Sequence, residues 1–161
     1  MSHEPFSGFA MIDIDVRTLH DRVGQEIAVS DWLEVSQARI GQFADATGDH
    51  QWIHVDPARA VAESPFKSTI AHGFLTLSLL SPLIRESIQF TGLRMAINYG
   101  LNKVRFVSPV PSGARIRARI TPGAFDLVGD GFQVTWYVTI ERERSGKPCC
   151  VAEWVVRYYP A

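Results

Sequence analysis

An acid and an imidazole lie five residues apart near the middle of the chain, at Asp49 and His54, and a glycine follows at Gly73. A carboxylate and an imidazole that both reach one water molecule can orient it, take a proton from it and deliver a proton elsewhere. A glycine at the start of a helix exposes an unpaired backbone N–H that can hold an oxygen becoming negative. Together these groups predict an active site for general acid/base chemistry.

Each of these residues also has a purely structural interpretation. An aspartate directly after a helix-ending glycine, here Asp49 after Gly48, is commonly a turn or cap residue. Gly73 can serve close packing alone, and His72 before it can be a satisfied polar residue at a helix start. The spacing of the residues does not by itself decide between catalysis and structure.

A metal site is the alternative use of the same segment. His50 and His54 are four apart, so on a continuous helix both rings would lie on one face and could bind zinc. Gly48 and Pro57 bracket this stretch, however, and indicate a loop or short extended piece over residues 50–56. Because the sequence positions no third ligand, we expect no metal here.

The helix before the acid has clear boundaries. Ser36 suits the N-cap position of a helix over residues 37–47, and Gly48 suits its end. Apolar residues recur within it at the spacing of one buried helix face, namely Ile40, Phe43 and Ala44. The acid therefore follows directly after a rigid element, where a functional side chain can be held in place.

Two further helices are expected after the histidine. Asp56 and Pro57 suit the cap and first position of a helix that ends before Pro65. A longer helix is expected from Gly73, apolar almost all round for three turns and therefore buried on most sides. Pro82 lies inside it and should remove one backbone hydrogen bond and kink it.

Strands dominate the chain after Gly92. Segments rich in β-branched and aromatic residues alternate there with turn signals and cover residues 95–107, 114–127, 132–143 and 149–159. Gly129-Asp130-Gly131 predicts a tight hairpin. Earlier, residues 16–23 suit a short helix and residues 25–35 alternate as a strand. We therefore expect an α+β domain, a hot-dog fold in which an antiparallel sheet wraps a long central helix.

Length and charge limit the remaining possibilities. A chain of 161 residues predicts one domain over residues 1–161, with residues 1–12 as an N-terminal arm. Sixteen basic and seventeen acidic residues give a net charge of −1, which provides no electrostatic footprint for nucleic acid or an anionic membrane. Arginines alternate along one expected strand and form either a solvated face or a contact for a phosphorylated substrate such as coenzyme A; they are Arg115, Arg117 and Arg119.

Cysteine usage and hydropathy bear on the compartment. The cysteines are Cys149 and Cys150, and as neighbours in a strand they are expected to point to opposite faces as small packing residues. They fit a reducing cytoplasm. Since no apolar run approaches the length of a membrane span and the N-terminus has no leader pattern, we expect a soluble cytoplasmic protein.

The segment around the acid and the histidine resembles the signature of the MaoC-like dehydratases, the (R)-specific enoyl-CoA hydratase family. The similarity covers most of residues 30–160, and its stretch Gly-Asp-His-Gln-Trp-Ile-His-Val-Asp is similar to the nodulation-protein-N-like branch. The matching motifs are Phe43-Ala44, Gly48-Asp49, His54, Asp56, Phe66 and Ile70-Ala71-His72-Gly73, followed by Phe106, Pro109-Val110 and Gly113.

This resemblance implies a hot-dog fold and reversible hydration of trans-2-enoyl-CoA to (R)-3-hydroxyacyl-CoA, a lyase reaction of fatty acid metabolism. The CoA thioester is then the substrate, and no cofactor or metal is needed. Asp49 and His54 match the catalytic pair, and the Gly73 N–H matches the oxyanion donor. By the same resemblance, Ser81 falls where related hydratases carry a serine near the catalytic aspartate. We expect three residues to contact the substrate, namely Ser81, Trp52 and His72. It implies a homodimer or a dimer of dimers.

One departure and two other functions stay open. This chain has Gln51-Trp52 where the family has Asn-Pro, so the acyl chain length that fits is not predicted, and Trp52 is expected to pack over the site as a lid. A hot-dog thioesterase would use Asp49 or a nearby water to attack the thioester carbonyl and release free thiol. A non-catalytic acyl-thioester-binding subunit would have little need of Asp49 and His54 together. The choice between CoA and an acyl-carrier protein, and the pathway, also stay open.

Overall fold

The computed structural model describes residues 10–161. Most of the expected N-terminal arm, residues 1–9 of 1–12, lies outside this part of the chain. The described chain opens with strand β1 (Ile12–Asp15), which pairs in parallel with β4 (Ile88–Thr91), and continues into the short 3-10 helix η1 (Val16–Arg22). The predicted helix near residues 16–23 is thus present in 3-10 form, and Gly24 follows it with a φ of +83°.

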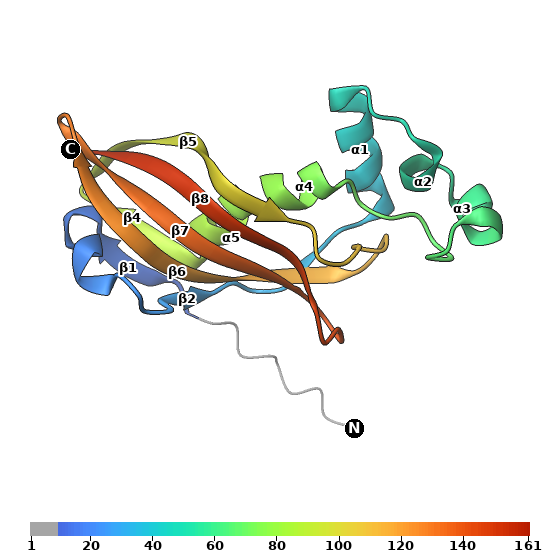
Figure 1. The fold of residues 1–161 in the computed structure, drawn as a ribbon, viewed down its shortest axis with the longest axis horizontal. Helices are drawn as coiled ribbons and strands as arrows, with labels where there is room; N and C mark the ends of the chain where they lie inside the picture. Colours follow the sequence, from blue (N-terminus) through green and yellow to red (C-terminus); the bar gives the residue numbers. More distant parts are fainter. Residues whose placement is uncertain (1–9) are drawn as a thin grey trace.

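The main sheet is antiparallel and holds the four long strands that the sequence predicts (Figure 1). Its order is β2-β6-β7-β8-β5, and β3 also pairs with β6. The strands are β2 (Ala28–Val29), β3 (Leu33–Glu34), β5 (Leu93–Arg105), β6 (Arg115–Val128), β7 (Gly131–Arg142) and β8 (Pro148–Pro160). The predicted hairpin is confirmed, because Val128 pairs with Gly131 and the connecting Gly129 has a φ of +59°.

The prediction of one strand over residues 25–35 is wrong. The segment forms two short pieces, because β2 pairs Val29 with Arg119 whereas β3 pairs Leu33 with Ile116, which leaves one extra residue between them. Within the gap, the Ser30 side-chain oxygen accepts the Ala118 N–H at 2.8 Å. A side chain here replaces the regular backbone ladder, which alternation of residue types cannot reveal.

The core lies between the inner face of the sheet and the helix pair α4 (Gly73–Ser78) and α5 (Leu80–Ser87). Alternate residues of β7 are all buried on this face: Phe132, Val134, Trp136, Val138 and Ile140. Leu83 and Ile84 of α5 pack against the same core. Since each such side chain contributes about 1.5–3 kcal/mol on burial, this layer supplies much of the driving force for folding. The expected α+β architecture and hot-dog fold are confirmed.

The long helix agrees with its prediction in one respect and differs in its burial. The helix is broken at Leu79 into α4 and α5. Pro82 has no N–H, so the hydrogen bond from position 82 to the Ser78 carbonyl is missing next to this break. The predicted kink is therefore present. The prediction that it is buried on most sides is wrong, because only one face packs on the sheet while Phe74 is 70% exposed. The helix also ends at Ser87, and the chain continues as β4.

Helices α1 (Gln37–Thr47), α2 (Trp52–Val55) and α3 (Pro57–Glu63) gather at one end of the sheet (Figure 1). The capping predictions are confirmed: Ser36 accepts from the Arg39 N–H, Gly48 closes α1 with a φ of +77°, and Asp56 accepts from the Arg59 N–H. No helix within residues 10–161 is long and apolar enough to cross a membrane.

The interpretation of residues 50–56 as a loop or extended piece is wrong, because α2 forms one helical turn there. The Asp56 N–H closes this turn on the Trp52 carbonyl at 3.0 Å. A distant side chain supports it, since Gln37 Nε2 donates to the His54 carbonyl at 2.8 Å. One turn is too short to show a helical period, so only the tertiary contact favours it.

Cys149 and Cys150 are both buried, next to a bulge that interrupts the pairing of β7 with β8 between Ile140 and Glu141. That the two side chains point to opposite faces of the strand stays a prediction. Burial raises the pKa of the Cys149 thiol to about 12 and that of the Cys150 thiol to about 11. Both therefore stay protonated thiols that pack as small apolar groups, as the sequence predicts for their chemistry.

Candidate active site

The helical end of the molecule brings three titratable side chains together. Asp49 follows the end of α1, His54 belongs to α2, and His72 precedes α4. A carboxylate oxygen of Asp49 and one ring nitrogen from each histidine lie within 4.8 Å of one another. The structure thus brings Asp49 and His54 together, as their five-residue spacing allows. One water molecule can span such a gap with two hydrogen bonds of about 2.8 Å.

His54 is held as a neutral base. Its side chain is buried, and Nδ1 lies 2.6 Å from the Ile70 carbonyl oxygen. Because a carbonyl only accepts, Nδ1 carries the proton, and Nε2 of the neutral ring keeps its lone pair. Burial lowers the pKa of His54 and the neighbouring His72 adds to this, while the Ile70 hydrogen bond and the charge of Asp49 oppose it; the net shift is downward from 6.5.

Asp49 contributes the exposed carboxylate of the pair. Its Oδ1 accepts from the Gln51 N–H at 3.3 Å, a long hydrogen bond, so much of its accepting capacity stays open to solvent. Its backbone carbonyl accepts a hydrogen bond from His72 Nε2 at 3.0 Å. The backbone of Asp49 is thus tied to the protein interior while its carboxylate faces outward.

His72 lies behind the pair. Its side chain is 3% exposed, and its ring stacks on that of His54 with centroids 3.8 Å apart and planes 23° apart. Phe43 of α1 packs against the same ring at 4.9 Å. The sequence predicts His72 as a helix-start or substrate-contacting residue and does not reveal its contacts with Asp49 and His54. The available signal was a histidine at a position where short capping residues are favoured.

The position of Gly73 is compatible with both of its interpretations, close packing and an exposed backbone N–H. A Cβ at this position would lie 2.9 Å from the Phe106 ring, so close packing alone requires glycine. The Gly73 N–H opens α4 and finds no acceptor among the residues that the structure describes. The amide is therefore available to a ligand oxygen at the place where the sequence predicts the oxyanion donor.

Ser81 and Trp52, the other predicted substrate residues, lie in different surroundings. Ser81 lines a cavity of about 350 Å³ between α5 and the inner face of the sheet, together with Asn98 and Trp154. It makes no hydrogen bond to Asp49 or His54 within the described chain. Trp52 is half-buried on α2, with the Arg59 guanidinium 4.3 Å from its ring. Asn98 and Trp154 carry no sequence signal, because only tertiary folding brings their strands to Ser81.

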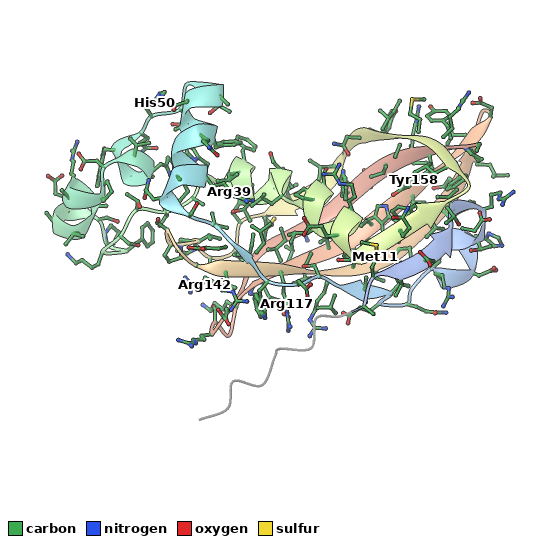
Figure 2. All side chains as sticks on the ribbon, turned by 180° about the vertical axis from the view of Figure 1, so that it is seen from behind. Met11, Arg39, His50, Arg117, Arg142 and Tyr158 are labelled. Atoms are coloured by element: carbon green, nitrogen blue, oxygen red, sulfur yellow. The ribbon has the colours of Figure 1, made fainter. Side chains whose placement is uncertain are left out.

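The donor set at this site fits a metal ion poorly. His50 lies near the outer end of α1 (Figure 2), where it pairs with Asp45 at 2.8 Å. It does not belong to the cluster of Asp49, His54 and His72. An imidazole binds a metal in its own ring plane, about 2 Å from the nitrogen. Because the rings of His54 and His72 are stacked nearly parallel, one ion cannot lie in both planes at that distance. The open nitrogen of His54 is suited to a water molecule instead.

The arginines of β6 face carboxylates across the sheet. Arg115 pairs with Glu143 at 3.2 Å, and Arg117 with Glu141 at 2.8 Å. Arg119 bonds both Glu141 and Glu26. These pairs favour the interpretation of a solvated strand face, since each guanidinium already has an anionic partner.

Comparison with known proteins finds relatives in sequence and in structure. The family model described as MaoC like domain matches residues 17–141. The 3-hydroxyacyl-thioester dehydratase Z of Mycobacterium tuberculosis is 51% identical over 144 residues, covering 89% of this chain and 95% of that protein. Nodulation protein N of Rhizobium leguminosarum bv. viciae is 46% identical, covering 90% and 91%. The solved R-hydratase of Pseudomonas aeruginosa superimposes with a TM-score of 0.66 at 25% identity, covering 86% and 83%.

Proposed function

The chain belongs to the family of MaoC-like dehydratases, and from that premise we propose that it reversibly hydrates trans-2-enoyl-CoA to (R)-3-hydroxyacyl-CoA. The observation that carries the proposal is the approach of an Asp49 carboxylate oxygen and a His54 ring nitrogen to within reach of one water. The name of the mycobacterial relative supports the class of reaction, and that of the solved R-hydratase supports the stereochemistry.

The site has a group for each step of such an addition. His54 Nε2 takes a proton from water while the Asp49 carboxylate accepts the other water hydrogen and orients the molecule. The resulting hydroxide adds to C3, the π pair of the C2–C3 double bond forms a C1–C2 double bond, and the carbonyl π pair moves to the thioester oxygen to give an enolate. The imidazolium, stabilised by the nearby carboxylate, then returns its proton to C2. The net change is one water added, with both residues restored.

The Gly73 amide completes this proposal. Negative charge on the thioester oxygen needs a donor that is already in place, and the Gly73 N–H has no competing acceptor among the described residues. Removing one such donor in other enzymes costs on the order of 3 kcal/mol, so this amide matters as much as a side chain.

An apolar groove beside α5 is a suitable place for the acyl chain. The cavity that contains Ser81 begins at Leu77, one helical turn beyond Gly73. A second cavity of about 460 Å³ shares Ser81, Asn98 and Trp154 with it and continues past Ile84. We propose that the acyl chain extends along this groove from a thioester bound near Gly73.

Two parallel assays test the proposed reaction. The purified protein is mixed with crotonyl-CoA and with a longer 2-enoyl-CoA while the enoyl-thioester absorbance is followed, and a thiol reagent is present in a second cuvette. A fall in absorbance without free thiol supports hydration. Release of thiol would instead indicate a thioesterase, and silence in both cuvettes with both substrates would reject turnover of these CoA esters.

Turnover is expected to survive strong chelators. The stacked rings of His54 and His72 offer no common position for a metal ion, so the reaction should depend on protein groups and water alone. The measurement is the initial hydration rate after prolonged incubation with EDTA or 1,10-phenanthroline, followed by removal of the chelator. A loss of activity that added zinc alone restores would contradict this prediction.

The edge of the sheet favours a homodimer. Among residues 10–161, strand β5 pairs on one side only, with β8, so within this part of the chain its other edge is unpaired. The strand also exposes apolar side chains, namely Met95, Ile97, Tyr99 and Leu101. A long edge strand with apolar side chains is a template for pairing with another chain. We therefore propose that two copies join through β5, and such dimers can assemble further.

A lysine on this edge is expected to separate the dimer. Leu101→Lys places a charge on the proposed interface, whereas Leu127→Lys, on a leucine that is 83% exposed near the end of β6, is the matched control. Light scattering coupled to size exclusion should give half the dimer mass for Leu101→Lys and the parental mass for Leu127→Lys. A monomeric parent, or an unchanged mass for Leu101→Lys, would reject pairing through β5.

A further inference from the structure

His72 occupies the N-cap position of α4, yet its side chain does not cap the helix. Ser, Thr, Asp and Asn are favoured at such positions because their short side chains accept from the first helical N–H groups. Here only the backbone carbonyl of His72 serves the helix, accepting from Leu75 at 3.1 Å and Thr76 at 3.2 Å. Helix capping therefore does not explain why a histidine is at this position. The residue is nevertheless buried, with 3% of its surface exposed.

The ring makes one directed contact, with the backbone of the acid. His72 Nε2 lies 3.0 Å from the Asp49 carbonyl oxygen, and because that oxygen only accepts, Nε2 carries the proton. This bond joins residues 23 positions apart. Asp49 otherwise lies in an exposed segment between Gly48 and α2, and its one other hydrogen bond within residues 10–161 is the long bond from the Gln51 N–H to its side chain. The hydrogen bond from His72 thus fixes the position of the Asp49 backbone, from which the carboxylate side chain extends.

The face of the same ring supports the base. The rings of His72 and His54 stack at 3.8 Å, while Phe43 packs against His72 from α1. The bond from His54 Nδ1 to Ile70 fixes one point of the His54 ring, and the stack fixes its plane. Together the two contacts determine the direction in which His54 Nε2 points.

We propose that His72 is a positioning residue that sets the Asp49 carboxylate and the His54 imidazole relative to each other. Its Nε2–H holds the acid's backbone, and its ring face holds the base. The other nitrogen, Nδ1, is buried and has no hydrogen-bond partner in the described part of the chain, so the residue acts through one donor and one face. The inference rests on the proposed hydration, for which these two residues are the catalytic pair.

The test separates the donor from the ring by two substitutions. In His72→Gln the side-chain amide can donate near the position of Nε2, whereas His72→Leu fills the space without a donor. We expect His72→Leu to lower kcat about 100-fold, because misplaced catalytic groups lose rate steeply. His72→Gln should recover about tenfold of that loss, the effect of one hydrogen bond to a positioned group. KM should stay near the parental value in both variants, because neither substitution removes a contact with substrate.

Several outcomes would overturn the proposal. Equal kcat values for His72→Gln and His72→Leu would show that the donor has no effect, and parental kcat in both would remove His72 from positioning. A raised KM at unchanged kcat would make it a substrate contact instead. Thermal unfolding is measured first; if His72→Leu does not fold, Phe43→Leu replaces it, because Phe43 supports the His72 ring from α1. Parental kcat in Phe43→Leu would then count against the proposal, and a lowered kcat at constant KM would support it.

A readout without turnover keeps this inference distinct from the proposed function. The amide group of His50 shares a peptide plane with the Asp49 carbonyl, so its NMR chemical shift responds to the hydrogen bond on that carbonyl. We expect a marked change of this signal in His72→Leu and a near-parental signal in His72→Gln. If the parent hydrates no enoyl thioester, the proposed function fails, and this comparison alone decides whether His72 positions Asp49. Identical spectra for that amide in all three proteins would overturn the inference.

Discussion

Asp49→Asn is expected to lower kcat for hydration by about 10³-fold while leaving the protein folded, since positioned acid/base groups contribute about 10²–10⁴-fold. The asparagine keeps the size of the side chain and the backbone carbonyl that His72 holds. It removes the negative charge that orients the water and stabilises the imidazolium of His54. Because Asp49 is exposed, the substitution leaves no buried group without a partner. The measurement is kcat from initial rates of enoyl-CoA hydration, with circular dichroism as the check on folding.

Asp45→Asn is the matched control. Asp45 is an exposed aspartate on α1 that pairs with His50 and stands outside the cluster. The Asp45→Asn substitution removes the same charge from the same end of the molecule. Because Asp45 lies outside the cluster, this variant should hydrate enoyl-CoA at a rate close to that of the parent. Equal losses in both variants would indicate a general electrostatic effect, and a near-parental rate for Asp49→Asn would remove Asp49 from the mechanism.

His54→Asn is also expected to lower kcat for hydration by about 10³-fold. The asparagine amide can replace Nδ1 as the donor to the Ile70 carbonyl, which would otherwise be left without its partner. It has no counterpart of Nε2, so only the proposed base is lost. His50→Asn tests the same change at the exposed histidine between α1 and α2 and should leave kcat unchanged. If His54→Asn is folded and turns over at the parental rate, His54 is not the base.

The pH dependence of the parent tests the same residue. His54 must be neutral to take a proton, and burial lowers its pKa below 6.5. Hydration measured as kcat/KM should therefore fall on the acid side of pH 6.5, as pH drops through the lowered pKa. Stability should fall in the same window, because below 6.5 the unfolded chain binds a proton that the folded chain resists. An acid limb centred above pH 6.5 would contradict the assignment.

The elements that local chemistry defines could be predicted from the sequence. Ser36 and Gly48 mark the ends of α1 because capping and left-handed closure are decided by neighbouring residues. Residue types and turn signals predict the four long strands, and Pro82 predicts the break in the helix. Each of these features depends on a few consecutive side chains, so a single sequence carries the information.

The features that depend on register and distant contacts could not be predicted. The bulge between β7 and β8 beside Cys149 and Cys150 shifts the pairing of the two strands, and a single sequence carries no signal for such a shift. The turn at α2 depends on Gln37, which is 17 positions from His54. At the site, the meeting of Asp49 and His54 followed from their family pattern. The bond from His72 to Asp49 spans 23 positions and needed the folded chain.

The most direct measurement is dehydration of the two enantiomers of a 3-hydroxyacyl-CoA, offered separately to the parent and to Asp49→Asn. The rise of enoyl-thioester absorbance reports the rate, and a thiol reagent in a parallel cuvette reports hydrolysis. If Asp49 and His54 form a one-water site for the (R) product, the parent converts the (R) enantiomer without releasing thiol and leaves the (S) enantiomer unchanged, while Asp49→Asn converts neither at a comparable rate. Conversion of the (S) enantiomer, release of thiol, or equal rates for the parent and Asp49→Asn would contradict it.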